Sequence, residues 1–138
     1  MKQLHQAAFE AAPLAMLVVD AEGAVVLLNR QAEVLFDYGR AELLGRPIEL
    51  LVPESARIRH AELRASFFHD PSARGMGVGR DVDGRRRDGT IVPLEIGLNP
   101  IVTDDGVRVI VSLVDLSSRK RAEATLLREQ ASLGRAFR

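Results

Sequence analysis

The chain has 138 residues, of which 28% are charged, and its 19 basic side chains are balanced by 19 acidic ones. This length fits one soluble globular domain with an appendage, and the balanced charge argues against nucleic acid as a partner. The lack of cysteine excludes disulfides and thiolate sites and fits a cytoplasmic location. No apolar run approaches the ~20 residues of a membrane-spanning helix, so we expect no membrane insertion by this segment.

The first half of the chain predicts short helices around one β-hairpin. Leu4–Ala12 is typical of an amphipathic helix that ends before Pro13, because the residue before a proline avoids helical geometry. The apolar runs Leu14–Asp20 and Ala24–Asn29 predict a hairpin with a turn at Ala21-Glu22-Gly23. The other elements expected before residue 70 are a helix at Arg30–Phe36, a short helix at Arg40–Leu44, an apolar link at Ile48–Val52 and a helix from Pro53 to about His69.

The second half predicts three longer strands. They cover Met76–Arg86, Thr90–Pro100 and Val107–Leu116, and Asp88-Gly89 and Asp104-Asp105-Gly106 provide the tight turns between them. The middle strand is apolar on one face only. The last strand is apolar on both faces, so we expect it to lie centrally in the sheet, with its outer side covered by another helix or subunit.

No linker separates the last strand from a final helix, which Ser117 or Ser118 can cap and which extends to about Phe137. A sheet that passes directly into a helix can transmit strain out of its core, which favours a sensor or regulatory module over an enzyme. Heptad-like spacing along this helix predicts a dimer contact or a connection to an effector, and is formed by Leu126, Gln130, Leu133 and Phe137.

Two polar residues fall on faces that we expect to be apolar. His60 belongs to a helical stripe expected to be buried, formed by Ala56, His60, Leu63 and Phe67. It is either a core-edge histidine that hydrogen-bonds a backbone carbonyl or an axial ligand of haem iron. Arg80 occupies an apolar position of its strand, where an unpaired charge is costly. It either pairs with an acid such as Glu62 or Asp81 or contacts a bound ligand.

Recognisable catalytic patterns are absent from the sequence. It contains no Ser-His-Asp ordering, HExxH, P-loop or GxGxxG motif. The glycines Gly77 and Gly79 do not open a helix, so they do not predict a phosphate cradle. We therefore expect a domain that is not itself catalytic.

Four segments together carry a resemblance to a known family. They read LAMLVVDAEGAVVLLNRQAEVLFDY, AELLGRPIELLVPE, GRRRDGTIVPLEIGLNPI and VSLVDLSSRKRAEATL. In this order they make residues 5–125 resemble a PAS domain, a sensory module found ahead of histidine kinases, cyclases and transcription factors. The resemblance implies an α+β fold, with a five-stranded antiparallel sheet in the order 2-1-5-4-3 and short helices on one face around a cavity. It divides the chain into an N-terminal helix (1–12), a core (13–117) and a C-terminal signalling helix (118–138).

Within that family, the segment RHAELRASFFHDPSARGMGVGRDVDGRRRDGT is similar to the haem-binding oxygen-sensor branch of nitrogen-fixation kinases. On this resemblance His60 matches the proximal iron ligand and Arg80 the distal arginine that bonds the gas. Ile96 and Leu98 match distal apolar residues. The possible cofactor is therefore haem, with His60 as its metal ligand.

The sequence departs from that branch at three positions. Leu63 and Ser66 stand where the branch has a tyrosine and an arginine, and Gly75 replaces a bulky aliphatic residue. The first two departures remove polar groups expected beside the haem propionates.

The leading hypothesis is a sensory domain of a signal-transduction protein such as a sensor histidine kinase. It couples ligand or partner binding in the core to a covalently linked effector through the final helix, as a homodimer, with Asp115 and Ser117 at the signal exit. One alternative is a haem-based oxygen sensor, and another is a homodimerisation module without a ligand.

Overall fold

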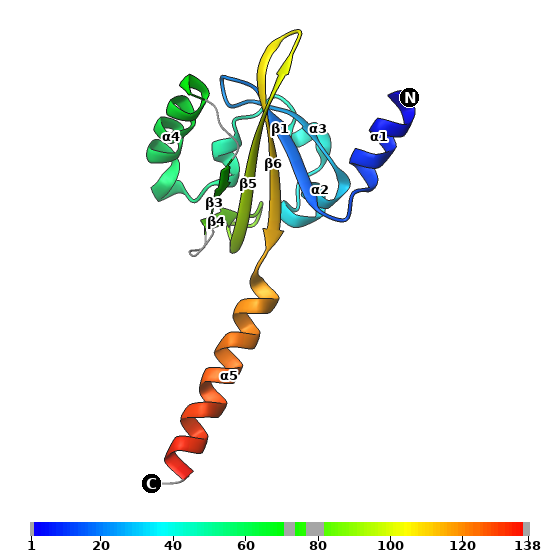
Figure 1. The fold of residues 1–138 in the computed structure, drawn as a ribbon. Helices are drawn as coiled ribbons and strands as arrows, with labels where there is room; N and C mark the ends of the chain where they lie inside the picture. The colour runs from blue at the N-terminus through cyan, green and yellow to red at the C-terminus, as the bar shows by residue number, and fades with distance from the viewer. Residues whose placement is uncertain (1, 71–73, 77–81, 137–138) are drawn as a thin grey trace.

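The computed structural model describes residues 2–70, 74–76 and 82–136 (Figure 1). The elements of the first half are α1 (Lys2–Ala11), β1 (Ala15–Val19), β2 (Val25–Leu28), α2 (Arg30–Phe36), α3 (Arg40–Leu43), the 3₁₀ helices η1 (Ile48–Leu51) and η2 (Glu54–Ala56), and α4 (Arg57–His69). Those of the second half are β3 (Arg74–Met76), β4 (Val82–Arg85), β5 (Ile91–Thr103), β6 (Gly106–Asp115) and α5 (Ser117–Ala136). The predicted helices and strands are thus present, with bounds shifted by a few residues.

One antiparallel sheet runs through the structure in the order β2-β1-β6-β5-β3, and β4 also pairs with β5. β3 pairs with the segment 96–98 of β5, and β4 pairs with the segment 91–94. β4 lies within the third predicted strand, Met76–Arg86, and β3 begins two residues before it and ends at its first residue. Residues 77–81 of this strand lie outside the described residues. Counted as one strand, β3 and β4 confirm the predicted α+β fold with the order 2-1-5-4-3. The central position of the last strand is also confirmed, since β6 lies between β1 and β5.

The core lies between the inner face of the sheet and the short helices. Alternation along the strands places Val92 and Leu94 of β5 and Val109, Val111 and Leu113 of β6 on this face, where all are buried. The helices and the hairpin add other buried side chains, among them Leu17, Leu28, Ala32, Phe36, Leu43 and Phe67. The alternation of β5 was therefore predicted correctly from the sequence.

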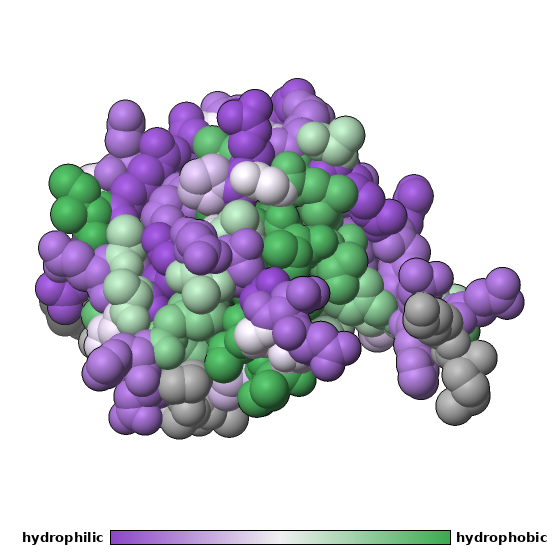
Figure 2. All heavy atoms as spheres, turned by 90° about the horizontal axis from the view of Figure 1, so that it is seen from above, coloured by the Kyte–Doolittle hydropathy of each residue, from purple (hydrophilic) through white to green (hydrophobic). Residues whose placement is uncertain are grey.

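Apolar side chains also remain exposed outside the core. Val114 on the outer side of β6 and Leu27 on β2 are both exposed. Figure 2 shows apolar side chains gathered across the middle of one side of the molecule, bordered by polar ones. The predicted cover over the outer side of β6, by another helix or subunit, stays a prediction. Among the described residues, none of the helices combines the length and apolarity that crossing a bilayer requires.

The stripe predicted to be buried on α4 is only partly so, since Ala56 and His60 are half-buried. Phe67 is buried as expected, but Leu63 is 51% exposed. Arg64 takes the inward place instead, because its guanidinium is paired with Glu49 of η1. A helix turns by about 100° per residue, so an inward Arg64 leaves Leu63 facing solvent.

The amide side chain of Asn29 is fully buried and joins three elements. Its Oδ1 accepts hydrogen bonds from Met16 N of β1 (3.0 Å) and from Ala32 N in the first turn of α2 (3.1 Å). Its Nδ2 donates to Phe9 O of α1 (3.0 Å) and to Leu14 O (2.9 Å). Asn29 is therefore both the N-cap of α2 and the point at which α1 is attached to the sheet.

We expect Asn29→Ala to lower the free energy of unfolding by roughly 3 kcal/mol, because it leaves buried backbone groups without partners. Urea denaturation of the 138-residue chain measures this loss. The matched control is Asn99→Ala, at an exposed position of β5, which should change stability by less than about 0.5 kcal/mol. Equal losses in the two variants would contradict the role assigned to Asn29.

Candidate functional site

The junction between β6 and α5 is held by the carboxylate of Asp115. Its Oδ1 accepts a hydrogen bond from Ser117 N (2.8 Å), and its Oδ2 lies 3.4 Å from Arg86 Nη2. The sequence predicted Ser117 or Ser118 as the cap of this helix. That prediction was wrong, since Ser117 is already the first helical residue and the side chain of Asp115 satisfies its N–H.

Leu116, between Asp115 and Ser117, anchors the junction to the sheet. Leu116 N donates to Pro93 O of β5 (2.9 Å), and Lys120 N donates to Leu116 O in the first turn of α5 (2.9 Å). The Leu116 side chain is buried. The start of α5 is thus attached to β5 through the backbone, whereas the rest of α5 extends away from the domain (Figure 1).

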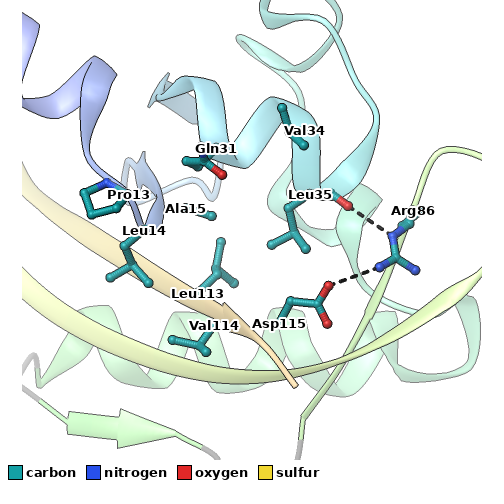
Figure 3. A pocket seen from close by; sticks show the side chains of 10 residues that line it. All are labelled: Pro13, Leu14, Ala15, Gln31, Val34, Leu35, Arg86, Leu113, Val114 and Asp115. Carbon is teal, nitrogen blue, oxygen red and sulfur yellow. Dashed lines mark hydrogen bonds and ion pairs between the residues drawn. The ribbon is translucent and has the colours of Figure 1, made fainter. Parts of the chain in front are cut away.

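Arg86 connects this junction to the helical side of the domain. It lies in the turn between β4 and β5, where Arg86 N donates to Thr90 O (2.9 Å). Its Nε donates to Leu35 O in α2 (3.2 Å) while its Nη2 reaches Asp115, as the dashed lines of Figure 3 show. One side chain therefore touches α2, the turn and the end of β6.

The next residue ties the same turn to α3. Arg87 N donates to Phe36 O at the end of α2 (2.9 Å), and its guanidinium pairs with Glu42 of α3. The guanidinium also lies 5.3 Å from the centre of the Tyr38 ring. The contacts of Arg87 therefore couple the position of this turn, which carries Arg86, to the positions of α2 and α3.

A groove of about 340 Å³ opens beside the junction. In Figure 3 the side chains of Leu14, Leu35 and Leu113 face a common space, and the Arg86–Asp115 pair closes one side of it. The other lining residues are Pro13, Ala15, Gln31, Val34 and Val114. The pair is therefore accessible from the surface rather than sealed in the core.

Opposing effects act on the ionisation of Asp115. Partial burial disfavours the charged form, but hydrogen bonds from Ser117 and the nearby positive charge of Arg86 outweigh it. Together they hold the pKa of Asp115 below its ordinary value of 3.8. The carboxylate is thus ionised, and able to accept the Ser117 hydrogen bond, throughout the neutral range.

A second polar cluster joins α4 to η1. Glu49 Oε2 lies 2.7 Å from His60 Nδ1. Arg64, one turn further along α4, donates from Nη2 to Glu49 Oε1 (3.1 Å) and from Nε to Oε2 (3.3 Å). The side chains of Glu49 and Arg64 are mostly buried, at 14% and 18% exposure, and that of His60 is 33% exposed. We call these three residues the α4 cluster.

The α4 cluster also reaches the hairpin between β1 and β2. Arg64 Nη1 donates to Ala21 O (3.3 Å). A Cβ on Gly23 would lie 2.5 Å from the guanidinium carbon of Arg64, so a side chain there would displace the end of Arg64. Gly23 has φ +85°, which glycine adopts without strain. Arg64 is therefore positioned by contacts that do not involve His60.

The structure separates the predicted site residues into two groups. Asp115 and Ser117 contact each other at the junction. His60 lies on α4, and its ring contacts the carboxylate of Glu49. One of the two predictions for His60 had a backbone carbonyl as this partner. Ile96 and Leu98 lie on the inner face of β5, half-buried against the core. Arg80 lies outside the described residues. In the part of the chain that the structure describes, no group of three or more potential metal ligands comes together.

Sequence reasoning missed Glu49, Arg64 and Arg86. Arg64 carried a usable signal, because it follows His60 by four residues and so shares its side of the helix. Arg86 lies in a run of three arginines that does not show which of them turns inward. Glu49 stands in an apolar link, and its partner on α4 is set by tertiary structure alone.

The comparisons with known proteins agree with this architecture. The family model described as the PAS fold matches residues 3–115. The chain therefore belongs to the PAS family, and it is a sensory domain that is not itself catalytic.

Two curated relatives are named as sensors. The chain is 30% identical over 121 residues to "Sensor protein FixL" of Bradyrhizobium diazoefficiens, a match that covers 88% of this chain and 24% of the relative. It is 24% identical over 110 residues to "Oxygen sensor protein DosP" of Escherichia coli, covering 80% of this chain and 14% of that protein. The chain thus spans a quarter or less of each relative.

Solved structures show the same fold at low identity. A PAS domain of an HTR-like protein from Haloarcula marismortui matches with a TM-score of 0.69 and 23% identity, over 83% of this chain and 90% of that one. A structure titled "an RNA-binding Light-Oxygen-Voltage Receptor" matches with a TM-score of 0.75 and 23% identity, over 95% and 37%. These matches support the fold alone.

The depressed pKa of Asp115 predicts a specific acid sensitivity. A carboxylate whose pKa is lower in the folded than in the unfolded chain contributes stability that is complete above the unfolded pKa and is lost as pH falls through the folded pKa. We expect wild type to be more stable than Asp115→Asn by a constant amount above about pH 5. This difference should shrink steadily below the ordinary value of 3.8.

Urea denaturation of both proteins between pH 3 and pH 6 tests this. Arg86→Ala should reduce the pH-dependent difference without removing it, because the hydrogen bonds from Ser117 remain. A difference between wild type and Asp115→Asn that does not vary with pH would refute the assignment.

Proposed function

We propose that this PAS domain is the input module of a signal-transduction protein, a sensor histidine kinase, and that it signals through α5 to a covalently linked effector. The observation that carries the proposal is the set of contacts by which Arg86 and Asp115 connect α2, the β4–β5 turn and the first residue of α5. Residues 13–117 act as the core, 1–12 as an N-terminal helix and 118–138 as the signalling helix.

Signalling requires two arrangements of this junction. In the arrangement described here, Arg86 holds Asp115 and Asp115 holds Ser117. A ligand or partner that favours a different packing of α2 or α3 moves the Leu35 carbonyl and the turn that Arg87 ties to α3. The pair then separates and the start of α5 is released. The signal is a shift in population between the two arrangements.

The exposed face of α5 supports a dimeric output. Leu126 and Leu133 are seven residues apart, and more than half of each side chain is exposed. Apolar residues at this spacing pair with a second helix. We therefore assign α5 to a homodimeric coiled coil that continues into the effector. The name of the relative "Sensor protein FixL" is consistent with a sensory role for this domain.

We expect Asp115→Ala and Ser117→Ala to uncouple output while the core stays folded. Asp115→Ala removes the partner of Ser117 N, which weakens the first turn of α5 by about 1 kcal/mol and speeds hydrogen exchange of its amides about fivefold. Ser117→Ala keeps the backbone N–H and removes only the side-chain hydrogen bond that helps to lower the pKa of Asp115, so its effect should be the smaller. In a fusion that places a histidine-kinase catalytic region after α5, both variants should change autophosphorylation.

The matched control is Asp104→Ala, an exposed aspartate at the tip of the β5–β6 hairpin. It should leave both readouts unchanged. Parental autophosphorylation in both junction variants would refute the coupling.

The α4 cluster supports a second candidate, haem-based gas sensing with His60 as the iron ligand. The donor chemistry of His60 fits the iron of this group. Nδ1 of the imidazole is hydrogen-bonded to the Glu49 carboxylate, and among the described residues Nε2 has no hydrogen-bond partner. A metal-binding histidine commonly has one ring nitrogen hydrogen-bonded in this way and the other available to the metal. Haem iron, when bound, supplies a coordination position for a diatomic gas.

The remaining residues of this candidate site have supporting roles. Ile96 and Leu98 provide apolar side chains from β5, and Arg80 remains the predicted partner of the gas. The relative "Oxygen sensor protein DosP" is named for such a function.

The haem candidate predicts a Soret absorption band in the purified or haemin-reconstituted chain. His60→Ala should abolish this band, because it removes the only ligand proposed for the iron. His69→Ala is the matched control, since His69 ends the same helix and is exposed, and it should retain the band. A wild-type chain without the band, or a His60→Ala variant that keeps it, would rule out this candidate.

A further inference from the structure

The contact between Glu49 and His60 defines which imidazole nitrogen carries the proton. A carboxylate only accepts hydrogen bonds, so at 2.7 Å the His60 Nδ1 must donate to Glu49 Oε2. The neutral imidazole then presents its lone pair at Nε2. Glu49 also fixes the plane of the ring, since its carboxylate is itself held by two hydrogen bonds from Arg64.

From this geometry we propose that Glu49 is a positioning residue for His60, and that Arg64 limits its effect; the inference rests on the haem candidate above. A carboxylate on the outer nitrogen of a metal-binding histidine orients the ring and makes it a stronger donor to the metal. Electron donation by the ligand stabilises ferric over ferrous iron. Glu49 therefore lowers the reduction potential of the haem.

Arg64 acts in the opposite direction. Its guanidinium binds both carboxylate oxygens of Glu49 and neutralises part of the negative charge that His60 senses. Arg64 is anchored independently by the Ala21 carbonyl and by its position over Gly23. Its removal therefore leaves the Glu49 carboxylate more strongly negative beside His60 Nδ1.

The opposite effects of Glu49 and Arg64 on the reduction potential distinguish a positioning role of the α4 cluster from a purely structural one. If the α4 cluster only attached α4 to η1, loss of either partner would loosen the same contact and change the haem in the same way. In the proposed role, loss of Glu49 weakens the donor and loss of Arg64 strengthens it. The two variants therefore shift the reduction potential in opposite directions.

The experiment uses the 138-residue chain reconstituted with haemin, as wild type, Glu49→Gln and Arg64→Gln. We expect the midpoint potential to rise in Glu49→Gln and to fall in Arg64→Gln. The iron–imidazole stretching frequency of the ferrous form, measured by resonance Raman, should fall in Glu49→Gln. Haem affinity should drop about ten- to a hundredfold in that variant.

The matched control is Arg59→Gln, which removes a positive charge from an exposed position of the same helix. It should leave the potential and the stretching frequency at wild-type values. Thermal unfolding of the haem-free variants identifies any loss of fold. If Glu49→Gln does not fold, Arg64→Gln still decides the matter through the direction of its shift.

The outcomes separate the two proposals. Haem binding that depends on His60, together with an unchanged potential in both variants or a shift in the same direction, overturns the role of Glu49 and leaves the haem candidate standing. A wild-type chain that takes up no haem overturns both.

Discussion

The buried amide of Asn29 is the constraint on which the arrangement of this domain depends. Two acceptors and two donors of the backbone meet there, from α1, the link between α1 and β1, β1 and α2. Each of these groups would be costly to bury without a partner. One side chain therefore determines where α2 begins and how α1 attaches to the sheet, and the core residues of α2 and the strands pack in the space that results.

The two polar clusters occupy different parts of the domain and suit different tasks. The α4 cluster lies on the helical side, where a half-buried imidazole is positioned by a carboxylate and a guanidinium. The junction of Arg86, Asp115 and Ser117 lies where the sheet passes into α5 and borders an open groove. In the proposed function the first serves sensing and the second serves output. The sheet, with β6 at its centre, connects them.

The sequence was informative where local chemistry decides the structure. Arg30–Phe36 was predicted to its exact bounds because Ala32, Leu35 and Phe36 fall on one side of a helix. Alternation along β5 identified the buried face, and apolarity on both sides of β6 identified the central strand. His60 stood out as a polar residue on an apolar face, and Asp115 as the residue at which the last strand passes into the final helix.

What the sequence determined by itself was the family, the central position of the last strand and the point where that strand passes into α5, because these follow from motif order, periodicity and turn residues along the chain. The full order of the strands followed from the resemblance to the family. Tertiary structure alone decided the partners. Glu49 meets His60, and Arg86 meets Asp115, across 11 and 29 positions. Arg64, not Leu63, faces inward because it pairs with the carboxylate of Glu49 in η1. Side-chain pairing between distant segments depends on how the elements pack, and no local pattern encodes it.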